Sequence, residues 1–229
     1  MADAPAFALG VLTRGRRDAA TACIDSALRH ADDLVVFCVV DDDRAAAAYL
    51  SNYYEGNPRV HVGLLPLRHY YVRGVNALGR WMQEAGVDHF AITNDDATFA
   101  VDGWDTTCRA LAAEGEIVEL AGDDLCAHYT SRMRTFVDHF HGLLAEPSYT
   151  FYCSDTELRE RAKELRLYSA RPDLALVTHH AADDAVHSEI TFWFAIDRAT
   201  YERRWRSPWK KEEWQRGIYG SSSRDTYVA

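Results

Sequence analysis

Short apolar runs alternate with stretches of helical periodicity along the first hundred residues of this chain. The apolar runs predict buried strands at residues 7–12, 34–40, 60–65 and 90–93, and the periodic stretches predict helices at residues 18–30, 45–54 and 72–85. The second run is apolar throughout, which is typical of a strand buried on both faces of a parallel sheet. We therefore predict an α/β fold with a mostly parallel sheet flanked by helices.

The second half of the chain predicts a smaller mixed sheet with its own helices. The expected strands lie at residues 117–121, 174–177 and 190–196, and the expected helices at residues 104–113, 155–166 and 199–205. Residues 126–150 are rich in His, Tyr and Phe and suit a substrate-facing insertion, and Ser154 suits the N-cap of the helix that follows. No repeat or linker interrupts the pattern. We expect one domain at residues 1–200, in two halves that meet near residue 100, and a Trp-rich basic helix with a loose tail at residues 201–229.

Polar and acidic residues follow the predicted strands at the points where the strands end. They are Thr13 and Arg14 after the first strand, Asp41 and Asp42 after the second, and Asn94, Asp95 and Asp96 after the fourth. In an open parallel sheet these ends share one edge, where ligands bind. Adjacent buried carboxylates repel each other, so a divalent ion such as Mg²⁺ or Mn²⁺ is a natural partner. An Asx-rich β-turn is the alternative interpretation of the acidic tripeptide.

Composition and charge narrow the class of protein. The chain has 229 residues, of which 48% are hydrophobic and 26% charged, as in an ordinary globular domain. A net charge of -10 argues against a broad nucleic-acid-binding surface, although Arg and Lys residues gather between tryptophans near the C-terminus. The five cysteines form no C-x-x-C pair, which disfavours a zinc site. No apolar run reaches the roughly 20 residues of a membrane span, and the first residues do not look like a signal peptide, so we expect a cytoplasmic protein.

The order of these motifs resembles that of the GT-A fold glycosyltransferases, most closely their inverting family 2, over about residues 7–200. The matching positions are Thr13 and Arg14, the V-D-D at Val40, Asp41 and Asp42, Gly74 with Asn76, the acidic motif Asn94-Asp95-Asp96, Asp155 and Glu157 in a segment like E-D-x-x-L, and His179. The resemblance implies a metal-dependent enzyme that transfers a sugar from a nucleoside diphosphate sugar to a hydroxyl acceptor. The expected donor is a UDP-sugar. It assigns the donor to residues 1–100 and the acceptor to residues 101–200.

The resemblance also implies roles for single residues. Asp96 and His179 would bind Mn²⁺ or Mg²⁺, and Asp95 would contact the donor. Arg14, Arg16 and Arg73 are candidate partners of the diphosphate, with Arg14 preferred, because one guanidinium can bind two phosphate oxygens. Asp155 would be the general base, with Glu157 as the fallback. Two positions depart from the family: Asn94 replaces an acid of the usual D-x-D, and Ser154 stands where the family has an acid.

The acceptor and the partners stay open at the level of sequence. The N-D-D-A-T-F motif resembles small stand-alone bacterial and phage transferases, which adds a hydroxylated DNA base to glycans and small molecules as possible acceptors. The C-terminal Trp-rich basic segment is expected to contact the acceptor, a nucleic acid or a membrane surface, or to dock on the domain or on a second subunit in a homodimer. Two other functions remain: a non-catalytic module that binds nucleotides or glycans, and a sugar-phosphate nucleotidyltransferase, for which the first turn has too few glycines.

Overall fold

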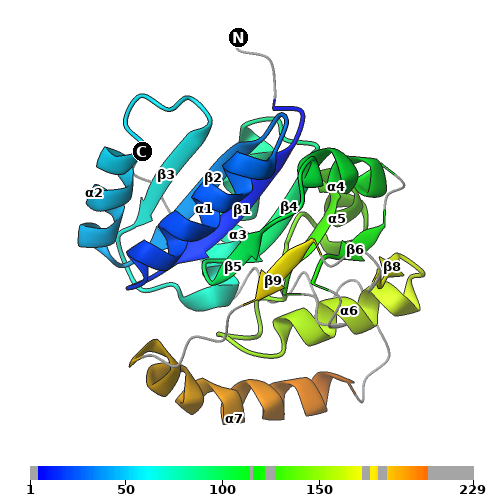
Figure 1. The fold of residues 1–229 in the computed structure, drawn as a ribbon. Helices are drawn as coiled ribbons and strands as arrows, with labels where there is room; N and C mark the ends of the chain where they lie inside the picture. The colour runs from blue at the N-terminus through cyan, green and yellow to red at the C-terminus, as the bar shows by residue number, and fades with distance from the viewer. Residues whose placement is uncertain (1–4, 114–115, 122–126, 172–175, 180–184, 206–229) are drawn as a thin grey trace.

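The computed structural model describes residues 5–113, 116–121, 127–171, 176–179 and 185–205. Its main sheet has seven strands in the order β3-β2-β1-β4-β7-β6-β8 (Figure 1). These strands are β1 (Ala8–Thr13), β2 (Val35–Asp41), β3 (Val60–Leu65), β4 (His89–Asn94), β6 (Ile117–Glu119), β7 (Tyr129–Arg132) and β8 (Tyr168–Ser169). β1 to β4 are parallel, and β7 runs antiparallel to both of its neighbours. A separate antiparallel pair joins β5 (Ala97–Phe99) to β9 (Val177–His179).

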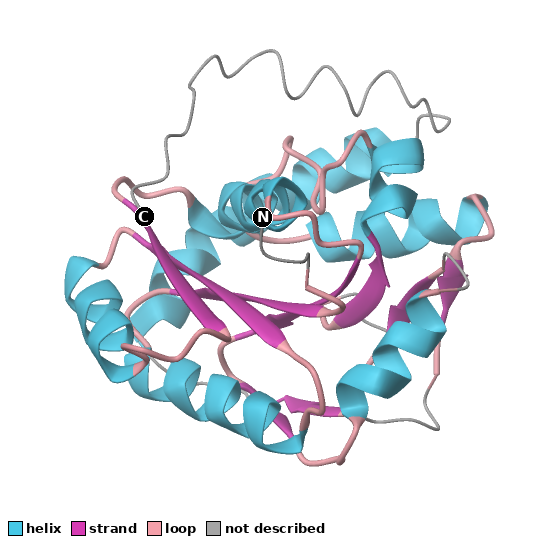
Figure 2. Cartoon of the chain, turned by 90° about the horizontal axis from the view of Figure 1, so that it is seen from above, coloured by secondary structure: helices cyan, strands magenta, loops and turns pink. Residues whose placement is uncertain are grey.

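Helices cover both faces of the main sheet (Figure 2). The helices are α1 (Arg17–His30), α2 (Arg44–Tyr53), α3 (Tyr70–Glu84), α4 (Trp104–Ala112), α5 (Met133–Phe140), α6 (Ser154–Glu164) and α7 (Ala185–Trp205). Apolar residues of α1, α2 and α4 form one core with the sheet, and those of α3, α5 and α6 form the other. This arrangement confirms the predicted α/β architecture with a small second sheet. Within the described residues, no helix is long and apolar enough to cross a membrane.

Two segments differ from the sequence prediction. Residues 190–196 were expected to form a strand, but they belong to α7. Their β-branched and aromatic residue types favour strands locally, but they lie inside a continuous 21-residue helix, and strand propensity depends strongly on context. Residues 126–150 were expected to form an insertion, but they contribute the internal strand β7 and the helix α5. β7 is short and polar, so no apolar run in the sequence predicted it as a strand. Its Thr130 hydroxyl is buried and donates to the Phe90 carbonyl at 2.8 Å.

The start of α6 also differs from the prediction. Ser154 is the first residue of the helix, whereas the N-cap is Cys153, with a φ of 64° and no capping side chain. A positive φ is unfavourable for any residue that carries a Cβ, so contacts elsewhere must hold this backbone. The predicted tail at residues 206–229 lies outside the described residues.

Candidate active site

The acidic tripeptide lies where the chain leaves the main sheet. Asp95 and Asp96 form a turn between β4 and β5. β5 pairs with β9 and not with β4, so this turn does not close a hairpin. The backbone of His179 pairs with Ala97, next to Asp96 in the chain, and the His179 side chain is outside the described part of the structure.

Asp95 is the most buried acid of this turn, with 5% of its surface exposed. The Thr13 hydroxyl at the end of β1 donates to Asp95 Oδ2 at 2.7 Å, and Arg16 Nη1 donates to Oδ1 at 3.2 Å. Burial raises the pKa of Asp95 to about 6, although Thr13 and Arg16 oppose the shift, and the neighbouring Asp96 adds to it. At neutral pH this edge therefore holds a carboxylate that is incompletely compensated.

Arg16 bridges the two acids. Its Nη1 lies 3.2 Å from Asp95 Oδ1 and 3.4 Å from Asp96 Oδ2, and its side chain is 17% exposed. The sequence prediction gave the cationic role to Arg14, which is half-buried at the same turn. Arg16 was only one of three candidate partners of the diphosphate, with Arg14 preferred, because a turn containing three arginines does not reveal which one faces the acids.

The acid pair suits a divalent cation. Two carboxylates share one guanidinium, and the raised pKa of Asp95 shows that more positive charge would stabilise them. No cluster of three His, Cys, Asp or Glu side chains that could hold a metal occurs among the described residues. Mg²⁺ and Mn²⁺ fit such a sparse site, because Mg²⁺ in particular is held by one or two carboxylates together with water and substrate phosphates.

Asp41, at the end of β2, is fixed by its surroundings. Its carboxylate accepts from Arg68 Nη1 at 2.6 Å, from the His69 N–H at 2.7 Å and from the Tyr70 N–H at 3.0 Å. The Arg68 guanidinium also lies 4.5 Å from the centre of the Tyr70 ring. Burial raises the pKa of Asp41, and the His69 N–H and Arg68 oppose that shift. Asp41 thus orders the turn at residues 68–70, which brings a cation and an aromatic ring to the same edge.

The other predicted donor contacts have different environments. Asp42 is exposed beside Asp41, and Arg73 is exposed on α3. Asn76 is buried, where its Nδ2 donates to the Ala145 carbonyl at 2.8 Å and its Oδ1 accepts from the Ala145 N–H at 2.9 Å. Asn76 therefore fastens α3 to the loop before α6. Asn94 ends β4 half-buried, and its carbonyl accepts from the Cys23 thiol at 3.6 Å.

Asp155 borders a small cavity at the start of α6. The lining comprises Tyr71, Val75, Tyr129, Leu144, Ala145, Ser154, Asp155 and Leu158. Burial raises the pKa of Asp155, and the hydrogen bond from the Thr156 N–H at 2.7 Å opposes that shift. Ser154 is 1% exposed, and its hydroxyl has no hydrogen-bond partner among the described residues. A carboxylate with a raised pKa beside a partly polar cavity is equipped to take a proton from a hydroxyl group.

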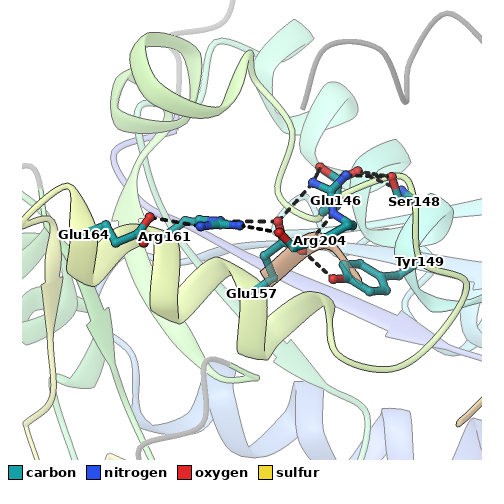
Figure 3. A network of polar contacts seen from close by, with 7 residues as sticks. All are labelled: Glu146, Ser148, Tyr149, Glu157, Arg161, Glu164 and Arg204. Atoms are coloured by element: carbon teal, nitrogen blue, oxygen red, sulfur yellow. Dashed lines mark hydrogen bonds and ion pairs between the residues drawn. The ribbon is translucent and has the colours of Figure 1, made fainter. Parts of the chain in front are cut away.

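Glu157 is enclosed in an ion network (Figure 3). It is fully buried and accepts from the Tyr149 hydroxyl, and Arg204 Nε and Nη2 lie 3.0 Å from its two oxygens. Arg161 Nε lies 3.5 Å from Glu157, and Arg204 also pairs with Glu146 at 3.0 Å. The carboxylate of Glu157 is saturated with donors, so the geometry favours Asp155 over Glu157 as the base.

Comparison with known proteins identifies the fold. No protein-family model matches the sequence, and no curated protein matches it significantly. Staphylococcal TarS 1-349 (S. aureus) in complex with UDP-GlcNAc matches 93% of this chain and 70% of its own, with a TM-score of 0.65 at 11% identity. The mannosyltransferase PcManGT from Pyrobaculum calidifontis, in complex with GDP-Man and Mn²⁺, matches 82% of this chain with a TM-score of 0.60 at 13% identity. The chain has a GT-A fold.

The GT-A chain is shorter than the proteins it matches. It spans 59% of another TarS 1-349 structure, with a TM-score of 0.59 at 13% identity, and 60% of PcManGT. At these identities the likeness concerns the fold. Within this GT-A fold, the turn after β4 carries the acid pair, the turn after β1 carries Arg16, and α6 carries Asp155.

Asp95→Asn should make the GT-A domain more stable at pH 7, by about 1–3 kcal/mol in urea unfolding. The pKa of Asp95 is raised to about 6 in the folded chain, from 3.8. Between these pH values the folded chain keeps a proton that the unfolded chain has released, so wild-type stability falls as pH rises through this window. The advantage of the variant should vanish below about pH 4. A variant less stable than the wild type at pH 7 would contradict this account.

Glu157→Gln should destabilise the domain by about 3 kcal/mol, because it leaves a half-buried Arg204 incompletely paired beside a fully buried side chain. Glu164→Gln is the matched control. Glu164 also pairs with Arg161, at 3.1 Å, but its side chain is 44% exposed, so its loss should cost under about 0.5 kcal/mol. Urea unfolding of both variants measures the difference, and equal losses would show that the network is not the stabilising element.

Proposed function

We propose that this protein is a metal-dependent glycosyltransferase. It moves a sugar from a nucleoside diphosphate sugar, specifically a UDP-sugar, to a hydroxyl acceptor, with inversion at the anomeric carbon. The observation that carries the proposal is the pair Asp95 and Asp96 at the carboxyl edge of the sheet, with one guanidinium between them. Solved structures of the same fold contain UDP-GlcNAc, or GDP-Man with Mn²⁺. A site short of positive charge on this fold suits a cation together with a diphosphate.

The donor side is built from β1, β2 and β4. Asp96 and Asp95 would hold Mn²⁺ or Mg²⁺, with His179 as a further proposed ligand, and the ion would neutralise the charge that grows on the departing diphosphate. Thr13 and Arg16 hold Asp95 in place at 2.7 Å and 3.2 Å. A cation held by the two acids would take the place of the Arg16 guanidinium, which would then bind the diphosphate. Arg14 and Arg73 keep their proposed part in binding the phosphates.

Asp41 and Arg68 would face the nucleotide base. Asp41 holds Arg68 at 2.6 Å, and Arg68 lies over the Tyr70 ring. A guanidinium held flat in this way can stack on a base or donate to its carbonyl groups. The exposed Asp42 beside it would reach the ribose.

The acceptor side is built from α6. The acceptor hydroxyl oxygen forms a bond to the anomeric carbon, the bond from that carbon to the diphosphate oxygen breaks, and the hydroxyl proton passes to the Asp155 carboxylate. Burial keeps the pKa of Asp155 above its ordinary value, which makes it a stronger base than an exposed aspartate. A glycan or a small molecule is the proposed acceptor, and a modified DNA base gains no support from the structural neighbours.

Titration calorimetry with UDP and Mn²⁺ tests the donor site. Asp96→Asn should weaken metal-dependent UDP binding at least about tenfold, because it removes a charged ligand. Asp102→Asn is the matched control, since Asp102 is an exposed acid with 92% of its side chain exposed. Protons compete with the cation for Asp95, so wild-type affinity should rise as pH rises through about 6. No binding in the presence of Mn²⁺, or equal losses in both variants, would refute the proposed site.

Asp155→Asn tests the base. Turnover of donor should fall about 100-fold or more, whereas affinity for UDP and Mn²⁺ should stay within about twofold, because the carboxylate acts on the acceptor proton. Steady-state transfer assays and calorimetry on the same preparation measure the two effects. A protein that binds the donor but never turns it over would instead be a non-catalytic binding module.

A further inference from the structure

The helix α7 binds to the rest of the domain along one face. Trp193, Asp197, Tyr201 and Arg204 lie four, four and three residues apart, which places them on the same side of an α-helix. Trp193 packs on Tyr70 with ring centres 5.3 Å apart, whereas Phe192, on another side of α7, is 67% exposed. Tyr201 is the one described residue of α7 that packs against a hydrophobic core. Phe194 packs edge-on against Tyr152, with ring centres 5.1 Å apart, and polar contacts add to these aromatic ones.

Asp197 accepts three backbone hydrogen bonds from one short segment. It is 1% exposed, and its carboxylate accepts the backbone N–H groups of Thr150, Phe151 and Tyr152 at 3.0, 2.7 and 2.8 Å. Successive N–H groups that converge in this way form an anion-binding concavity. In this protein the anion comes from the chain itself, 45 to 47 residues further on.

The turn that Asp197 holds leads directly to the proposed base. Thr150–Tyr152 is followed by Cys153, whose φ of 64° is unfavourable for a residue with a side chain. α6 then begins at Ser154, and Asp155 is its second residue. The backbone of this short turn thus decides where Asp155 and Ser154 meet the cavity.

Arg204, near the C-terminal end of α7, contacts the start of α6. Its Nε and Nη2 donate to Glu157, two residues beyond Asp155, at 3.0 Å each. Figure 3 shows Arg204 beside Glu157 in this network. Arg161 of α6 lies 4.8 Å from the Trp205 ring, which adds a second contact between the two helices. α7 therefore holds the backbone on both sides of Asp155.

We propose that Asp197 is a positioning residue for Asp155, and that α7 serves to hold the turn from Thr150 to Cys153 so that the base faces the acceptor. This inference rests on the proposed function. Asp197 does not touch the acid pair Asp95 and Asp96 in any described contact, so its influence falls on the acceptor step and not on donor binding.

The test is a double-mutant cycle between Asp197→Asn and Asp155→Asn, read as kcat. The asparagine side chain keeps one acceptor oxygen and loses the charge. In the wild-type background Asp197→Asn should lower kcat about 10- to 100-fold, with the KM for donor and the affinity for UDP with Mn²⁺ within about threefold. In the Asp155→Asn background it should lower the residual kcat by less than about threefold, because a misplaced base no longer matters. Equal losses in both backgrounds would overturn the proposal.

Glu202→Gln is the matched control. Glu202 lies on α7 between the anchors, is exposed, and pairs with Arg198 at 3.2 Å on its own helix. It should leave kcat within about twofold of the wild type. Cys153→Gly provides a rescue, because glycine adopts a positive φ without strain. Added to Asp197→Asn, it should restore part of the lost kcat and should help the variant to fold.

Amide hydrogen exchange separates this inference from the proposed function. In Asp197→Asn, amides of residues 150–156 should exchange at least about tenfold faster, and those of residues 94–97 should be unchanged. Unchanged exchange at residues 150–156 would overturn the positioning role whatever the enzyme assays show. If the wild type neither binds UDP with Mn²⁺ nor transfers sugar, the proposed function fails, and the exchange result still decides whether Asp197 holds the turn.

Discussion

Two adjacent carboxylates lie largely buried at the end of β4, and the electrostatic cost of keeping them there organises the edge of the sheet. Thr13 and Arg16, at the end of β1 and on the turn that follows it, approach because β1 and β4 pair in parallel and end together. These partners offset part of the repulsion and of the desolvation, and the pKa of Asp95 still rises to about 6. The remaining deficit of positive charge is what makes this edge receptive to a cation and to the phosphates that accompany it.

Other buried acids in the same chain accept hydrogen bonds from more donors than Asp95 does. Asp41 has Arg68 and two backbone N–H groups, Glu157 has Tyr149 and two arginines, and Asp197 has three backbone N–H groups. Each of these carboxylates joins segments that lie apart in the sequence. Asp95 and Asp155 have fewer donors for their burial, which raises the pKa of each. Burial raises the pKa of Asp41 as well, so a raised pKa does not by itself separate acids that support the fold from acids suited to chemistry.

The helix α7 links the two sides of the site. Trp193 contacts Tyr70 beside Arg68 and Asp41, and Asp197 and Arg204 contact the segment that carries Asp155. One helix therefore contacts both the turn proposed to bind the nucleotide base and the segment proposed to face the acceptor. The described contacts that fix its position are therefore both aromatic, with Tyr70 and Tyr152, and polar, through Asp197 and Arg204.

The sequence by itself determined the alternation of strands and helices up to residue 113 and the acidic ends of β2 and β4, because burial of a strand or of a helix face leaves a local periodic pattern. It also pointed to Asp155 through family resemblance. Only the tertiary structure decided that Arg16 bridges the acids, that Glu157 is captured by Arg204, that β7 is an internal strand and that residues 190–196 are helical. These features depend on partners that are distant in the chain. The local pattern of hydrophobic residues does not indicate which distant donor contacts which acid.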